Sequence, residues 1–157
     1  MTIQEAVEKW SDYYDVPEDL IYAMIEVESS NQTYAMRYER HYKWLYHEKS
    51  IASKKGVPYY TELVQQKTSW GLMQVMGAVA REQGFEGRYI AELCNPEVGV
   101  KYGVKYLRKL YDRYGSWQDA ISAYNQGSPR KNNEKYQNQG YVDKVLNARS
   151  DVNERSE

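Results

Sequence analysis

The stretch "LIYAMIEVESS", residues 20–30, sets two glutamates into an otherwise apolar run with helical spacing. Each residue of a helix turns the chain by about 100°, so residues two positions apart lie on nearly opposite faces. Glu26 falls on a polar face, and we expect it to be a solvated surface charge. Glu28 instead continues an apolar row, which is formed by Ile21, Met24 and Ile25. The stretch therefore predicts a helix with one acid at the end of its buried stripe.

A carboxylate at the position of Glu28 is either paired or neutralised. Removing a lone charge from water costs several kcal/mol, and the group responds by raising its pKa. One interpretation is a buried structural glutamate that is bonded to an arginine or to a helix end. The other is a carboxylic acid that stays protonated near neutral pH, which is the general acid that glycoside cleavage requires. Position alone leaves both interpretations open.

Helix start and stop signals recur along the chain. Thr2 and Glu5 form a capping box, which predicts a first helix to about Tyr14. Pro17 suits the first position of the helix that carries Glu28, and the two acids after it face the positive helix end. These signals predict a mainly α-helical fold.

The second half of the chain carries the clearest helix signals. An asparagine cap and a glycine stop bound a predicted helix over residues 95–115. A capping box of Ser116 and Asp119 predicts the next helix, which ends at Gly127. Further helices are predicted over residues 75–84 and, near the end, from about residue 141 to residue 148.

Two segments show no clear period. Residues 31–69 contain "YERHYKWLYHEK", which is rich enough in aromatics to suggest a short helix or a packed loop. The polar segment "SPRKNNEKYQNQ", residues 128–139, is predicted to be a mobile linker. No run of alternating β-branched residues or internal repeat occurs. We therefore expect one mainly helical domain over residues 1–157.

The composition restricts the partners of the chain. Its 157 residues are enough for about one domain, and 21 Lys and Arg against 22 Asp and Glu give a net charge of -1. Such a balance provides no field to gather nucleic acid or an anionic membrane. No segment approaches the length of an apolar membrane span, so we expect no membrane insertion. We expect a monomer.

The same sequence gives no sign of a metal, a disulfide or a leader. Cys94 is the only cysteine, and His41 and His47 lie six residues apart, which is poor evidence for a metal site. We expect no metal and no cofactor. The start "MTIQEAVEKW" lacks a basic region followed by an apolar one, which predicts synthesis in the cytoplasm without a signal peptide.

Five sequence elements occur in an order that resembles the catalytic domain of soluble lytic transglycosylases. They are Glu28-Ser29 after an apolar helix, "GLMQVM" at residues 71–76, "NPEVGVKYGVKYL" at 95–107, "AYNQG" at 123–127 and "YVDKVL" at 141–146. The resemblance spans about residues 17–148. It implies a lysozyme-like fold that is related to goose-type lysozyme.

The resemblance also implies an activity and a site. The family cleaves the bond between N-acetylmuramic acid and N-acetylglucosamine in peptidoglycan, in the periplasmic or extracellular cell wall. By this analogy Glu28 protonates the leaving oxygen and then takes the proton of the muramic C6 hydroxyl, which closes to a 1,6-anhydro end. The implied substrate-binding residues are Ser29, Gln74, Met76, Tyr124, Asn125 and Tyr141, with Tyr124 hydrogen-bonding near the acid.

The residues themselves allow plainer interpretations. Gly71 permits a close backbone approach or an unusual φ, and Met76 is most simply a core residue. Gln74 must find a hydrogen-bond partner, either a sugar or the backbone. Tyr124 follows helical spacing, so its ring also suits the core, with the hydroxyl satisfied internally; Tyr141 is similarly ambiguous.

Two features, one of them a departure from the family pattern, raise other activities as alternatives. Trp70 in "TSWGLMQ" replaces the usual serine and resembles the aromatic of goose-type lysozymes, which hydrolyse the bond. Glu39 is a candidate second carboxylate, because two carboxyls about 6.5–9.5 Å apart can hold a water for inverting hydrolysis. The alternative is that Glu39 pairs with Arg37 or Arg40 on the surface.

The chain therefore has three functional hypotheses: a lytic transglycosylase, a hydrolysing muramidase, and a non-catalytic wall-binding or virion structural protein. "RYERHY", residues 37–42, resembles a stretch of some phage-encoded muramidases, which suggests a role in phage lysis or wall penetration. Several aromatic side chains either stack on sugar faces or cover the core beneath a long loop: Trp44, Tyr46, Tyr59, Tyr60 and Trp70.

Overall fold

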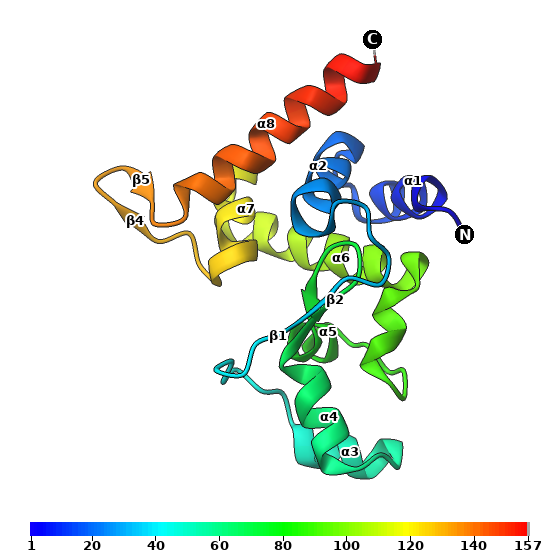
Figure 1. The fold of residues 1–157 in the computed structure, drawn as a ribbon. Coiled ribbons are helices and arrows are strands. Elements are labelled where there is room, and N and C mark those ends of the chain that lie inside the picture. The colour runs from blue at the N-terminus through cyan, green and yellow to red at the C-terminus, as the bar shows by residue number, and fades with distance from the viewer. Residues whose placement is uncertain (157) are drawn as a thin grey trace.

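Helix α6 (Pro96–Tyr114) crosses the middle of the molecule, and α1 (Ile3–Tyr14) and α7 (Trp117–Gln126) pack against it (Figure 1). The computed structural model describes residues 1–156. Helix α2 (Glu18–Ser29) packs against α8 (Gln139–Ser156) at one end of the molecule. The short helices α3 (Glu48–Lys55) and α4 (Tyr59–Gln66) lie at the opposite end (Figure 1). The mainly helical, lysozyme-like fold that the sequence predicts is therefore confirmed.

Local capping sets most helix ends where the sequence predicts them. The Thr2 hydroxyl accepts from the Glu5 amide at 3.0 Å, and the Glu5 carboxylate accepts from the Thr2 amide at 3.2 Å. Asn95 caps α6, and the left-handed Gly115, with φ 82°, ends it. Pro17 lies one residue outside α2 as its N-cap, so its predicted place inside the helix was wrong by one position.

Helix α8 is much longer than the predicted helix over residues 141–148. Its second half is polar, so the sequence pattern gives no buried stripe there. Two ion pairs join this half to α2: Arg149 lies 2.8 Å from Asp19, and Arg155 lies 3.2 Å from Glu26. Glu26 is thus exposed, as the sequence predicts, and it also has a partner on α8.

Small antiparallel sheets occur where the sequence predicts none. One has the order β1-β2-β3, and a hairpin of β4 and β5 lies inside the predicted linker. Strands of two or three residues are too short to show an alternating pattern, so no strand signal is visible in the sequence. Their bounds are β1 (Met36–Tyr38), β2 (Thr68–Trp70), β3 (Val75–Met76), β4 (Lys131–Asn132) and β5 (Lys135–Tyr136).

The turn between β2 and β3 packs very closely on the 3-10 helix η1 (Ile90–Cys94). Gly71 has φ 72°, and a Cβ there would lie 2.6 Å from the Leu93 carbonyl oxygen. Both interpretations of Gly71, close approach and unusual φ, are therefore confirmed. Helix α5 (Gly77–Glu82) follows β3 directly and begins two residues later than the predicted start at residue 75.

A buried ion pair joins α4 to α5. Arg81 donates to both oxygens of Glu62, at 2.8 and 3.0 Å, and each side chain is 1% exposed. Arg81 also donates to the carbonyls of Phe85 and Gly87, and Gln66 donates to Glu62 at 2.8 Å. Because further hydrogen bonds satisfy both ions, the pair is tolerated in the interior.

We expect Arg81→Met to destabilise the fold by about 3–5 kcal/mol, because it leaves the Glu62 carboxylate buried without its cation. Arg37→Met is the matched control, since Arg37 is 77% exposed in its ion pair with Glu39, and we expect it to change stability by less than about 1 kcal/mol. Urea unfolding of the three proteins at one pH measures both values. Equal losses in the two variants would contradict the role given to the buried pair.

Candidate active site

The Glu28 carboxyl lies half-buried in the last turn of α2, facing α8. The Tyr141 hydroxyl, from the first turn of α8, donates to Glu28 Oε2 at 2.5 Å. The same hydroxyl lies 3.8 Å from the Met24 sulfur, one helical turn before the acid. The Glu28 side chain thus lies between the apolar stripe of α2 and the Tyr141 phenol.

Burial raises the pKa of Glu28 to about 6, and the hydrogen bond from Tyr141 acts in the opposite direction. Desolvation disfavours the charged form, whereas a donor aimed at the carboxylate favours it. Among residues 1–156 no arginine or lysine forms an ion pair with Glu28, so the interpretation as a structural Glu–Arg pair is wrong. An acid in this state changes its protonation near neutral pH.

Tyr124 lies close enough to Glu28 for that charge to help raise its own pKa, although burial is the larger cause. Its hydroxyl, however, donates to the Met73 carbonyl at 2.6 Å. The bond near the acid that the resemblance implied for Tyr124 is made by Tyr141 instead. The Tyr124 ring tilts against Tyr106, with 5.4 Å between the ring centroids.

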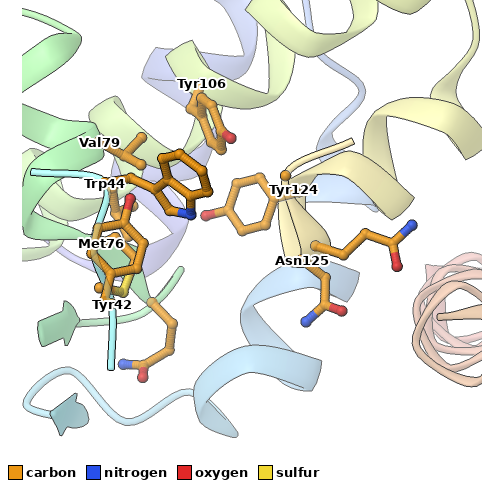
Figure 2. Close-up of a pocket in the computed structure, with 11 residues that line it drawn as sticks. Tyr42, Trp44, Met76, Val79, Tyr106, Tyr124 and Asn125 are labelled. Atoms are coloured by element: carbon orange, nitrogen blue, oxygen red, sulfur yellow. The ribbon is translucent and has the colours of Figure 1, made fainter. Parts of the chain in front are cut away.

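Tyr124 also lines a pocket of about 290 Å³ (Figure 2). Four residues that the resemblance implied line it together: Gln74, Met76, Tyr124 and Asn125. Glu28, Ser29 and Tyr141 do not line this pocket, and Tyr124 is the lining residue whose pKa the Glu28 charge raises. Sequence reasoning missed Tyr42 and Tyr106, which also line it; Tyr42 lies in "RYERHY" and Tyr106 in "VKYL".

A model of the Transglycosylase SLT domain family matches residues 5–147. The chain belongs to this family. Membership indicates lytic transglycosylase activity on peptidoglycan, and so action on the cell wall. No solved structure gives a match to this SLT domain.

Gln74 is engaged entirely within the SLT domain. Its amide nitrogen donates to the carbonyls of Ala35 at 3.0 Å and Gly71 at 2.9 Å, and its oxygen accepts from Ser69 at 2.9 Å. Its backbone is left-handed, with φ 49°. Two backbone carbonyls and the Ser69 hydroxyl thus engage the amide, so Gln74 braces the wall of the pocket.

The remaining implied residues differ in how much of their polar surface is free. The Ser29 hydroxyl donates back to the Ile25 carbonyl at 3.1 Å. Asn125 Oδ1 accepts from Asn138 at 3.0 Å, whereas its amide nitrogen has no partner in the described chain. Met76 is half-buried where β3 meets α5. Asn125 is therefore the free hydrogen-bond donor of the implied set.

Trp70 and Glu39, the two features that raised other activities, have plain structural explanations in this SLT domain. Trp70 is 7% exposed and its indole donates to the Gln65 carbonyl at 3.0 Å, so the ring is part of the core. Glu39 accepts from Arg37 at 2.9 Å, and its side chain is 41% exposed. This is the ion pair that the alternative interpretation of Glu39 predicts.

Across residues 1–156 no cluster of three or more His, Cys, Asp or Glu side chains is arranged to hold a metal ion. In the same residues no helix combines the length and apolar character that crossing a bilayer requires.

We expect the activity of the SLT domain to fall as pH rises through the pKa of Glu28, about 6, because the acid must start protonated. Tyr141→Phe removes a donor that favours the carboxylate, so the pKa and this alkaline limb should both move upward. The pH profile of kcat/KM, with carbon NMR of the Glu28 carboxyl, measures the shift. Tyr60→Phe on α4 is the control, and a downward shift in Tyr141→Phe would refute the assignment.

We expect Glu28→Gln to stabilise the fold by about 1–2 kcal/mol at pH 8, since burial moves the pKa from its ordinary 4.5 to about 6. The favourable contribution of the protonated acid is complete below about pH 4.5 and is lost as pH rises through about 6. Urea unfolding at pH 4 and pH 8 tests this. The gain should shrink at pH 4, and a loss of stability at pH 8 is the contrary result.

Proposed function

We propose that this SLT domain cleaves the bond between N-acetylmuramic acid and N-acetylglucosamine with one carboxyl group, leaving 1,6-anhydro muramic ends. The observation that carries the proposal is the Glu28 carboxyl, whose pKa is about 6 and whose only hydrogen-bond donor in the described chain is Tyr141. One group must serve first as acid and then as base, and a pKa near the working pH suits both steps.

The proposed reaction proceeds in two steps. Protonated Glu28 gives its proton to the glycosidic oxygen while the bond from that oxygen to the muramic anomeric carbon breaks. The Glu28 carboxylate, which now accepts from Tyr141, then takes the proton of the muramic C6 hydroxyl. The C6 oxygen bonds to the anomeric carbon, so no water is consumed and Glu28 is again protonated.

One observation favours this reaction over hydrolysis. Glu39, the candidate second carboxylate, is half-exposed and engaged with Arg37. The candidate second carboxyl is therefore already paired and is not free to hold a water for hydrolysis. The non-catalytic hypothesis is disfavoured because an uncompensated buried acid lowers stability near neutral pH and gives a structural protein nothing in return.

For the biological setting we propose bacteriophage lysis or wall penetration. The support is the resemblance of residues 37–42, "RYERHY", to phage-encoded muramidases. The same stretch carries Glu39 and leads into the loop that lines the pocket. Lysis of host cells by phage that carry Glu28→Gln in this gene tests the setting: delayed lysis or failed entry supports it, and unchanged plaques oppose it.

We expect digested peptidoglycan to give muropeptides that lack one water relative to reducing ends, because the C6 oxygen replaces water. Mass spectrometry of the digest measures this, and products that carry oxygen-18 from labelled water would instead show a hydrolase. Glu28→Gln should lower turnover by about 10²–10⁴-fold, the usual contribution of general acid–base catalysis. Glu39→Gln is the matched acid control and should retain wild-type turnover.

A further inference from the structure

The loop between β1 and α3, residues 39–47, brings two aromatic side chains to the pocket beside Tyr124 (Figure 2). We call this segment the aromatic loop. Its Trp44 ring is 70% exposed although it lines a pocket, and Tyr42 stands beside it. A large aromatic ring that lines a pocket and is exposed to water suits ligand binding. A ligand that covers the ring removes its apolar surface from water, which is favourable.

The pocket also presents polar atoms that lack partners. Within residues 1–156 no protein group bonds to the hydroxyls of Tyr42 and Tyr106, the Trp44 indole nitrogen or the Asn125 amide nitrogen. Exposed ring faces with a few converging donors are the pattern of a small-molecule site that fixes orientation by hydrogen bonds. A sugar ring fits it, since its C–H face packs on an aromatic ring and its rim carries hydroxyl and acetamido groups.

Size and charge narrow the choice of sugar. The volume of about 290 Å³ lies at the small end of ligand pockets, which begin near 300 Å³, and so suits a single ring. Among the residues that the structure describes, no charged side chain lines the pocket. N-acetylmuramic acid carries a lactyl carboxylate or its peptide, which would find no cation here. N-acetylglucosamine is neutral, and its acetamido carbonyl can accept from Asn125.

A buried network holds the aromatic loop in place. The fully buried Gln66 side chain accepts from the Tyr46 amide at 2.8 Å and donates to the Tyr46 carbonyl at 2.9 Å. It also donates to Glu62, which Arg81 fixes from α5. Tyr46 lies two residues after Trp44, so the interior of the protein sets where the loop stands.

We propose that Trp44 stacks on an N-acetylglucosamine unit of the bound glycan strand, and that Gln66 is the positioning residue of the aromatic loop. The identity of the glycan rests on the proposed function. Trp44 contacts the glycan, and Gln66 acts by positioning Trp44. Substitutions of either residue should therefore change the affinity for the glycan, and neither residue takes part in proton transfer.

The first test compares Trp44→Ala, Trp44→Phe and Tyr60→Ala. Tyr60 is the matched control because it is 73% exposed and lies on α4, outside the pocket. Binding of the N-acetylglucosamine tetramer is measured by calorimetry in the Glu28→Gln background, and kcat and KM are measured on uncrosslinked glycan strands. Trp44→Ala should raise Kd and KM about tenfold, as expected for a buried aromatic anchor, and leave kcat within about twofold. Trp44→Phe should keep most of the affinity.

The second test asks whether Gln66 acts through Trp44. Gln66→Met frees the Tyr46 backbone and should raise KM in the wild-type background while kcat stays within about twofold. In the Trp44→Ala background the same change should have no further effect on KM, because coupled residues are not additive. Thermal melting verifies that each variant is folded at the assay temperature. Additive effects on KM would overturn the positioning role.

The outcomes separate this inference from the proposed function. Unchanged Kd and KM in Trp44→Ala, with normal cleavage products, overturn the sugar site and leave the function intact. Absence of any cleavage product, with tetramer binding that still depends on Trp44, overturns the function and leaves the site. Stronger loss in Tyr60→Ala than in Trp44→Ala also overturns the site.

Discussion

The contact on which the site depends is the hydrogen bond between the Tyr141 hydroxyl and the Glu28 carboxyl, at 2.5 Å across two packed helices. Burial alone would keep the carboxyl protonated, and a strong donor alone would keep it ionised. The two effects oppose each other, and the pKa comes to rest near 6. Because α8 supplies the donor and also covers the acid, its docking on α2 sets both effects at once.

The docking of α8 depends on more than its apolar residues. Val142 and Val145 face the core, whereas the second half of the helix is polar and is joined to α2 by Arg149 and Arg155. Partly exposed ion pairs contribute little each, typically below about 1 kcal/mol. They nevertheless join α8 to α2 about two and four turns after Tyr141. The contact between the helices that brings Tyr141 to Glu28 therefore extends along α8.

Local signals explain which parts of the fold could be predicted. The capping box at Thr2, the asparagine cap at Asn95 and the glycine stop at Gly115 each act within a few residues, so the sequence alone places those helix ends. Helix α8 beyond residue 148 and the sheet of β1, β2 and β3 depend on partners distant in sequence. No local pattern encodes such partners, and the sequence analysis missed both.

The same distinction applies to the site. The helical spacing of Glu28 predicts a buried acid, and the order of the motifs finds Tyr141 and the pocket residues Met76, Tyr124 and Asn125. The hydrogen bonds of Gln74 could not be foreseen, because its partners lie on residues 35, 69 and 71 and meet only in the folded chain. Gln74 of the "GLMQVM" motif therefore holds the turn between β2 and β3 against residue 35.

Two glutamates, Glu62 and Glu28, show how the partner of a carboxyl group decides whether its charge is compensated. Glu62 receives both nitrogens of the Arg81 fork and the Gln66 amide, so its charge is compensated within the interior. Glu28 receives one neutral phenol and no cation in the described chain, so its charge is only partly compensated. Glu62 is 1% exposed and Glu28 is half-buried, so the less buried of the two carboxyl groups is the one without a cation. The deciding property is the partner: the Arg81 guanidinium pairs the Glu62 charge, whereas Tyr141 offers Glu28 one neutral donor.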